Sequence, residues 1–458
     1  MHGELIDLPA LGPSGPYRAY NRRVVPDVTG APFAELSMAP RLFVDRALAA
    51  LRSAPAMPLP ARVAALTEAS RVFLHDNVSG MSFEDYAGAV SRVSGVPVSV
   101  VRRAGAEIAN AAVKAESSAY GARPVGAAAD WRDTATLAGR GVWTRRGEVF
   151  AVHAAGNHPA PHALWLEALA LGYRVAVRPS RREPFTPYRL VSALRAAGFG
   201  DDRVVLLPTD HGGADVILAG ADLGLVYGGD EVVAKYAGDT TVRTQGPGRS
   251  KILVTASADW RDHLDLIVDS VAAHAGVACL NTTTVLVQGD PGPLAAAIAE
   301  RLAALPSLPP QDDRAVLPVT TAEAAEALER YLRAQAGEGK AWLGGAGIVD
   351  ELGDGSAVLR PSVYQLDAAP RGGRGVELPF PCVWVAPWSP ADGLAPLRET
   401  LVLTVLTDDE SLVDRLLVEP SISNVYLGDH PTHWLEPGVP HDGYLGEFLM
   451  RGKTVIRG

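Results

Sequence analysis

Cysteine is nearly absent from this chain. Among its 458 residues only two are cysteines, Cys279 and Cys382. Two cysteines cannot build a disulfide framework, and they exclude zinc and iron–sulfur sites that need several thiolates. Because only two are present, the role of each cysteine is considered separately: one can be a catalytic residue while the other packs in a core.

Positive charge and long apolar runs are also scarce. A formal net charge of −10 argues against a protein that binds nucleic acid through its phosphates. No run of about 18 uncharged apolar residues occurs, so we expect no transmembrane helix and no membrane partner. The first residues lack a basic start followed by an apolar stretch, so we expect no secretory signal and a cytoplasmic protein.

What remains is an ordinary globular composition. Apolar residues make up 47% of the chain and charged residues 21%, which excludes collagen, coiled coil and wholesale disorder. The length corresponds to two or three domains of about 150 residues, enough to bury a core without disulfides or metals.

Short apolar runs alternate with helical patterns in the middle of the chain. We expect strands at 149–153, 174–178, 204–207, 223–227 and 241–244, and helices at 160–171, 187–197, 214–219 and 230–237. This alternation predicts βαβ units and a parallel, doubly wound sheet of the α/β class. Ligands bind such sheets at the carboxyl ends of the strands, so a cofactor is expected at the loops after Val152, Val177 and Val226.

Further elements are expected on both sides of this region. Before it, helices are predicted at 41–52, 59–75 and 100–119. After it, a second unit is predicted. Its strands are at 251–254, 284–287, 357–364, 383–386 and 401–406, and its helices are at 260–273, 293–304 and 321–336. The segment 444–456 is interpreted as an extended strand that pairs with a distant hairpin or with another chain.

Cys279 lies between a predicted helix and a β-branched strand, in the segment AHAGVACLNTTTVLV. Its small neighbours leave the thiol open to a carbonyl substrate, and backbone N–H groups are expected to lower its pKa, since thiolate is the nucleophilic form. The alternative is a small buried hydrophobe, the usual state of a single cysteine. Cys382 stands at the start of an apolar strand and is interpreted as a packing residue.

The segment around Cys279 resembles the cysteine motif of the aldehyde dehydrogenase superfamily, Ala-Gly-Gln-x-Cys before a threonine-rich strand, with Val277 in place of the glutamine. Other segments resemble motifs of that family in the same order along the chain: 156–159, 178–180, 183–187, 197–199, 204–208, 228–231, 360–363, 377–381 and 446–452. This collinear set covers nearly the whole chain from about Val25 onward.

The resemblance implies a fold of three parts. They are a Rossmann-type nucleotide-binding domain (1–133 and 149–246), an α/β catalytic domain (247–432) and a small β oligomerisation element (134–148 and 433–458). It also implies a homodimer or homotetramer.

The same resemblance implies a chemistry for two residues. Family members attack an aldehyde with a cysteine thiolate, here Cys279, to give a thiohemiacetal, and hydride transfer to NAD(P)+ leaves a thioester. Asn157 matches the asparagine that donates to the oxyanion together with the backbone N–H of the cysteine. From its local sequence alone, Asn157 fits equally well as a turn residue before Pro159.

The chain departs from the family at the general base. Hydrolytic members carry a glutamate where this chain has Gln245, 34 residues before Cys279. A glutamine amide cannot accept a proton at neutral pH, so hydrolysis of a thioester at Cys279 is expected to be slow unless another base, such as Glu377 or Glu447, substitutes.

Members that lack this glutamate include acylating enzymes that use coenzyme A. We therefore expect reduction of an acyl thioester, bound to coenzyme A or to an acyl carrier protein, to an aldehyde with NADPH. Oxidation of an aldehyde to an acid is the alternative, and a catalytically silent binding or structural subunit is a third.

The expected cofactor pocket contains more arginine than is usual in NAD-preferring members. Arg178 and Arg181, with Arg182 beside them, suit a 2′-phosphate and favour NADP(H) over NAD(H), unless they form only a solvated basic turn. By resemblance and position, the other cofactor-binding residues are Gly156, Ser180, Gly228, Gly229, Val232 and Glu377, the last of which would hold the nicotinamide ribose.

Two other patterns are rejected. His153, His158 and His162 suggest a metal site, but prolines between them break the helix that an i, i+4 pair needs. Gly339-Lys340 resembles the end of a P-loop, yet Ala334 and Ala341 replace residues that such a loop requires.

Overall fold

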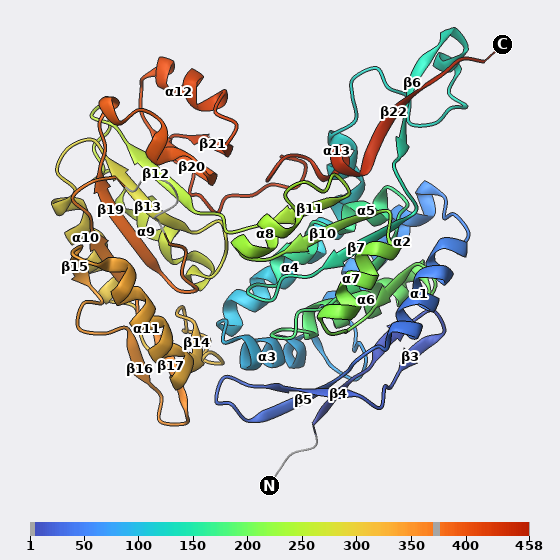
Figure 1. Cartoon of the computed structure of the whole chain (residues 1–458), viewed down its shortest axis with the longest axis horizontal. Helices are drawn as coiled ribbons and strands as arrows, with labels where there is room; N and C mark the ends of the chain where they lie inside the picture. The colour runs from blue at the N-terminus through green and yellow to red at the C-terminus, as the bar shows by residue number, and fades with distance from the viewer. Residues whose placement is uncertain (1–4, 370–375, 458) are drawn as a thin grey trace.

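A computed structural model gives the fold of the chain, and it describes residues 5–369 and 376–457 (Figure 1). Two large sheets with their helices form two lobes, on the right and the left of Figure 1. A two-stranded arm, β6 (Arg140–Arg145) with β22 (Met450–Val455), projects from the right-hand lobe. In these ranges no helix is long and apolar enough to cross a membrane.

The right-hand sheet has the doubly wound topology that the sequence predicts. Its strands are, in spatial order, β11 (Val242–Gln245), β10 (Leu223–Tyr227), β7 (Val149–His153), β8 (Arg174–Arg178), β9 (Val204–Leu206), β2 (Ala10–Gly12) and β3 (Gly15–Tyr17). Strands β7 to β11 run parallel, and the chain leaves β7 first to one side and later to the other. The strand order therefore reverses between β7 and β10, where a ligand crevice opens.

Helices cover both faces of this sheet. They are α1 (Arg41–Ser53), α2 (Leu59–His75), α3 (Phe83–Ser94), α4 (Val98–Gly121), α5 (Leu166–Ala170), α6 (Phe185–Leu194), α7 (His211–Gly220) and α8 (Asp230–Tyr236). Val149 and Ala151 of β7 pack with α1 and α7, whereas Phe150 and Val152 pack with α2, α4, α5 and α6. Successive strand residues point to opposite faces, so a strand buried on both sides is apolar throughout.

The left-hand sheet is built in the same way. Its strands are β15 (Lys340–Leu343), β18 (Ser362–Gln365), β19 (Cys382–Pro387), β13 (Thr282–Val287), β12 (Ser250–Val254), β20 (Thr400–Leu406) and β21 (Ile422–Leu427). All are parallel to their neighbours except β15. Its faces pack against α9 (Leu264–Ala272) and α10 (Gly292–Ala303) on one side and α12 (Glu410–Leu417) on the other.

Smaller elements complete the described chain. One three-stranded sheet comprises β1 (Ile6–Leu8), β5 (Pro32–Ser37) and β4 (Arg22–Pro26), and a second comprises β14 (Val319–Thr321), β17 (Ser356–Leu359) and β16 (Val349–Glu351). The remaining helices are α11 (Ala322–Ala336) and the single turn α13 (Leu445–Leu449).

Most predicted elements are present, with four corrections. The helix expected at 160–171 is a short 3₁₀ turn, Ala160–Ala163, followed by α5. The strand expected at 357–364 is two strands, β17 and β18, divided at Pro361. The helix expected from 260 starts only at Leu264, and the segment expected to be extended from 444 begins with α13.

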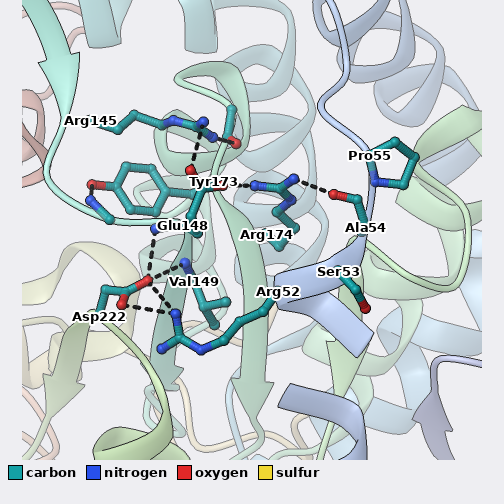
Figure 2. Close-up of polar contacts among 12 residues, drawn as sticks. Arg52, Ser53, Ala54, Pro55, Arg145, Glu148, Val149, Tyr173, Arg174 and Asp222 are labelled. Atoms are coloured by element: carbon teal, nitrogen blue, oxygen red, sulfur yellow. Dashed lines mark hydrogen bonds and ion pairs between the residues drawn. The ribbon is translucent and has the colours of Figure 1, made fainter. Parts of the chain in front are cut away.

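A polar network lies at the amino-terminal ends of the strands of the right-hand sheet, where β6 is followed by β7 (Figure 2). One oxygen of Asp222, just before β10, accepts the backbone N–H groups of Glu148 and Val149 at 2.7 and 2.9 Å. The same carboxylate pairs with Arg52 of α1 at 3.0 Å, and Arg174 of β8 pairs in turn with Glu148. One side chain thus ties α1, β7 and β10 together at the base of the arm.

We predict that Asp222→Ala lowers the free energy of unfolding by about 2 to 4 kcal/mol, because it leaves two backbone donors and Arg52 without their acceptor. Urea denaturation followed by circular dichroism measures this change. Asp215→Ala is the matched control: its ion pair with Lys235 is exposed, with 63% and 55% of the two side chains accessible. Its loss should cost less than about 0.5 kcal/mol, and equal losses in the two variants would contradict the prediction.

Candidate active site

A cleft of about 990 Å³ lies at the carboxyl ends of β7, β8 and β10, where the sheet order reverses. Residues from both lobes line it. Ten of the eleven residues predicted for the site are in its wall: Gly156, Asn157, Arg178, Ser180, Arg181, Gly228, Gly229, Gln245, Cys279 and Glu377. Val232 is not; its side chain lies against Gly228, behind the wall.

Cys279 stands where the sequence predicts, between α9 and the central strand β13 of the left-hand sheet. The turn before it has three successive residues with positive φ: His274 (53°), Ala275 (60°) and Gly276 (69°). Only glycine adopts this region without strain, so the other two cost roughly 1 to 3 kcal/mol each. Gly276 is also required by space, since a Cβ there would clash with the backbone of Pro381. In this strained conformation the turn brings His274 and Cys279 into the cleft wall.

Asn281 fixes this turn, and the sequence analysis did not identify it. Its side-chain oxygen accepts the N–H of Ala278 at 2.9 Å. Its amide donates to the carbonyls of Ser270 at 3.2 Å and Ala273 at 2.7 Å, at the end of α9. The side chain is buried, so these backbone groups have no solvent to replace it. One buried amide therefore satisfies both sides of the turn that carries Cys279.

The thiol of Cys279 is partly exposed in the cleft, but its pKa is raised to about 12. Burial is the main cause, and the negative charges of Glu377 and Asp442 add to it. The backbone N–H groups of Cys279 and Leu280 lower the pKa, as the sequence analysis expects, but burial outweighs them. The expectation of a lowered pKa is therefore wrong for the resting protein.

Asn157 follows β7 and faces the same part of the cleft. Its amide donates one N–H to the carbonyl of Val277 at 2.8 Å, two residues before Cys279. An amide carries two N–H groups, so the second can donate to an oxygen held at the thiol. The bond to Val277 fixes where that second N–H points.

Gln245 ends β11, and its amide nitrogen donates to Asp442 at 3.3 Å. The other oxygen of Asp442 accepts the hydroxyl of Ser423 at 3.0 Å. Asp442 thus fixes the orientation of the Gln245 side chain, a role that no sequence motif indicated.

The carboxylates proposed as substitute bases are placed differently. Glu447 is exposed and does not line the cleft. Glu377 lines it, but one oxygen accepts the backbone N–H groups of Gly248 and Arg249 at 2.8 and 3.0 Å. Glu167 of α5, which the sequence analysis did not consider for this role, also lines the cleft, and burial raises the pKa of its carboxyl to about 7.

The cofactor side of the cleft leaves space beside its glycines. A Cβ on Gly156 would collide with the hydroxyl of Ser180, so only glycine fits there, while Gly229 faces open space. Arg178 donates to the carbonyl of Thr209 at 3.3 Å, and its Nε is buried without a partner. These features fit a ligand that needs close backbone approach and a hydrogen-bond donor.

The neighbouring basic residues have different partners. Arg181 contacts the ring of His211 at 2.9 Å, at the start of α7, and both line the cleft. Arg182 also lines the cleft, and its guanidinium donates to the carbonyl of Ser94 at 3.3 Å. The basic side chains at this end are therefore Arg178, Arg181 and Arg182, and His211 accepts a hydrogen bond from Arg181, a contact that no motif in the sequence indicates.

The histidines at 153, 158 and 162 do not form a metal site. Only His158 lines the cleft, while His162 accepts from the indole of Trp165 at 3.3 Å. In residues 5–369 and 376–457, no group of three histidine, cysteine, aspartate or glutamate side chains is arranged to hold a metal ion.

We predict that Asn281→Ala lowers the free energy of unfolding by about 3 kcal/mol, because the buried partners of its amide lose their hydrogen bonds. Guanidinium denaturation measures this loss. Asn110→Ala is a suitable control, since Asn110 is an exposed residue of α4. If both variants were equally stable, Asn281 would not be the support of this turn.

We also predict that alkylation of Cys279 by iodoacetamide accelerates about tenfold per pH unit from pH 7 to 10, because thiolate is the reacting form and the pKa is about 12. Peptide mapping by mass spectrometry gives the rate at each cysteine. Cys382 is buried in β19 and serves as an internal control that stays unmodified. A plateau below pH 9 would contradict the raised pKa.

Comparison with known proteins relates the sequence to one family. The sequence model of the aldehyde dehydrogenase family matches residues 149–368. The aldehyde-dehydrogenase-like protein y4uC of Sinorhizobium fredii is 24% identical over 128 residues, a match that spans 27% of this chain and 25% of that protein.

Two solved structures cover almost the whole chain. The aldehyde dehydrogenase KauB from Pseudomonas aeruginosa superposes with a TM-score of 0.82 at 17% identity, over 98% of this chain and 96% of that one. The indole-3-acetaldehyde dehydrogenase AldA of P. syringae, in complex with NAD+, gives 0.81 at 17% identity over 99% and 97%. Residues 149–368 thus match the aldehyde dehydrogenase family, and the chain shares its fold with the solved aldehyde dehydrogenases.

Proposed function

We propose that this protein is an NAD(P)-dependent oxidoreductase that reduces an acyl thioester to an aldehyde through an acyl group carried on Cys279. The observation that supports this direction is Gln245. Its amide is held by Asp442, and by its spacing of 34 residues from Cys279 it corresponds to the glutamate of hydrolytic family members. The carrier of the acyl group would be coenzyme A or an acyl carrier protein.

Acyl transfer to Cys279 needs no separate base. The thiol sulfur forms a bond to the thioester carbonyl carbon, and the bond from that carbon to the carrier sulfur breaks. The proton of Cys279 leaves with the carrier, which departs as a free thiol. Because thiolate is the attacking form, a pKa of about 12 keeps the resting thiol slow, and the departing carrier sulfur is the group that takes its proton.

Reduction places negative charge on the acyl oxygen. A bound reduced nicotinamide supplies the hydride. The free N–H of Asn157 and the backbone N–H of Cys279 then donate to the oxyanion, and losing one such donor costs on the order of 10² to 10³ in rate. Breakage of the carbon–sulfur bond releases the aldehyde and returns the Cys279 thiolate, which takes up a proton.

Gln245 preserves the acyl group for this step. Its amide cannot remove a proton from water, so no hydroxide is generated next to the thioester. The lifetime of the acyl group on Cys279 is then set by the slow attack of unactivated water.

The residues at the cofactor end fit NADP(H). Gly156 and Gly229 would allow close backbone approach to the pyrophosphate, and Glu377 would hold the nicotinamide ribose. Arg178, Arg181 and His211 would accept a 2′-phosphate, for which arginine provides several donors.

Oxidation of an aldehyde to an acid is the second candidate function. Glu167 supports it, because a buried carboxyl with a pKa of about 7 in the cleft wall has the right proton affinity for a general base. A catalytically silent subunit is less consistent with the geometry, since the Asn157 amide is held against the turn that carries Cys279.

The assembly follows from the arm. Strands β6 and β22 form a two-stranded sheet in the described chain; Ala128 bridges the second edge of β6, and no further strand pairs with the second edge of β22. Such edges pair readily with another copy. We therefore propose that the arm forms the contact of a homodimer or homotetramer.

We predict that the protein oxidises NADPH when given acyl-CoA and that Gln245→Glu raises hydrolysis of the Cys279 acyl group at least about tenfold, because a carboxylate can activate water. Intact-mass spectrometry follows the decay of the acyl form, and absorbance at the nicotinamide band follows reduction.

Two controls make the result decisive. Cys279→Ala should form no acyl protein, and Glu167→Gln should leave reduction intact. Rapid oxidation of aldehydes to free acids that Glu167→Gln abolishes would replace the reductive proposal by the oxidative one. An unchanged decay rate in Gln245→Glu would show that this position does not control hydrolysis.

A further inference from the structure

Three histidines from separate parts of the chain meet in the cleft wall. His158 follows Asn157, His274 lies in the strained turn before Cys279, and His433 belongs to the segment between β21 and α13, which crosses from the left-hand lobe to the right-hand one in Figure 1. Ring centroids are 4.9 Å apart for His158 and His274 and 5.5 Å for His274 and His433, with the planes nearly perpendicular. All three line the cleft.

Each ring has a buried nitrogen without a hydrogen-bond partner: Nε2 of His158, Nδ1 of His274 and Nδ1 of His433. Nδ1 of His158 accepts the N–H of Ala160 at 3.2 Å, so a neutral ring carries its hydrogen on the unpartnered Nε2. His158 and His274 are 4% and 8% exposed. An unsatisfied buried polar atom costs roughly 1 to 3 kcal/mol, so a ligand that supplied partners to these nitrogens would recover part of that cost.

A metal ion is not that ligand. The three rings stack edge to face, and neither they nor other described side chains form a ligating set. Phenylalanine in place of each histidine would pack equally well against an alkyl chain, without the cost of the unpaired nitrogens. The cluster therefore favours a substrate part that accepts hydrogen bonds.

The charges around the cluster favour an anion. Arg103 of α4 lines the cleft, and its positive charge lowers the pKa of all three rings. In the described ranges no ion pair engages Arg103. Three carboxylates lie near the cluster: the exposed Asp269 is 3.4 Å from Nε2 of His433, Glu436 is paired with Lys114 at 2.8 Å, and burial raises the pKa of Glu107.

We propose that His158, His274, His433 and Arg103 form an acyl-group subsite that selects substrates with a carboxylate at the far end of the acyl chain. This inference rests on the proposed function for the reacting end of the substrate and adds its chemical class. A site that pairs its polar groups with the substrate discriminates strongly against an analogue that lacks the partner, because its own groups then stay unpaired.

The first test compares glutaryl-CoA with pentanoyl-CoA, which differ in a terminal carboxylate against a methyl group. With the full-length protein and NADPH, we expect kcat/KM to be about 10- to 100-fold higher for glutaryl-CoA. Equal values for two turned-over substrates would overturn the subsite and leave the reductive function standing. Equal preference for 5-hydroxypentanoyl-CoA and glutaryl-CoA would show that charge is not read, which also overturns it.

Variants assign the effect to the cluster. His433→Phe and Arg103→Gln should each remove most of the preference for glutaryl-CoA while changing kcat/KM for pentanoyl-CoA less than about threefold. His162→Phe is the matched control, since His162 is also buried with an unpartnered Nε2 but does not line the cleft. A preference that survives both cluster variants would place its origin elsewhere.

The last measurement does not require turnover. Glutarate should protect Cys279 from iodoacetamide at concentrations at least about tenfold lower than pentanoate does, and His433→Phe should abolish that difference. Equal protection by the two acids overturns the subsite even if no thioester is reduced. Differential protection without any acylation of Cys279 would support the subsite and contradict the proposed function.

Discussion

The site depends on how one buried amide ends a helix. The last carbonyls of α9 have no partners within the helix, and Asn281 supplies donors to those of Ser270 and Ala273 while it accepts the N–H of Ala278. These bonds span the turn in which His274 and Ala275 hold strained, positive φ angles. The strain persists because the surrounding bonds determine the backbone on both sides. Without this arrangement Cys279 and His274 would not share one wall.

Electrostatics around the thiol explain why an amide at position 245 matters. Glu377 and Asp442 already raise the pKa of Cys279, and burial raises it further. A glutamate at position 245 would add a third negative charge beside Asp442. Its carboxylate has no hydrogen to donate, so it would repel the carboxylate of Asp442. The Gln245 amide instead gives Asp442 a donor and leaves the charge near the thiol unchanged. Gln245 therefore offers no base and at the same time stabilises a carboxylate that belongs to this chain's own network.

The sequence was sufficient for the parts of the structure that local pattern encodes. Apolar strands such as β7 and β8 were predicted from their residues because both faces are buried, and the reversal of strand order placed the cleft at the loops that follow them. Cys279, Asn157 and Gln245 were found because they lie in short motifs. Asn281, Asp442 and Glu167 were not, because their roles come from partners that are distant in sequence or from burial, which no spacing reports. The pKa of Cys279 was misjudged for the same reason, since the backbone effect is local and the larger burial effect is not.

His158 was rejected as a metal ligand from the sequence, but the structure places it in a cluster of three histidines. His158 failed as a metal ligand because prolines separate it from His162, and the fold then places it against His274 and His433, which come from 116 and 275 residues further along the chain. Three imidazoles with unpaired nitrogens destabilise an empty wall. The strained backbone at His274 adds to that cost. In the proposed subsite, a substrate with matching acceptors recovers these costs on binding and one without them does not, which is how this wall would distinguish one acyl group from another.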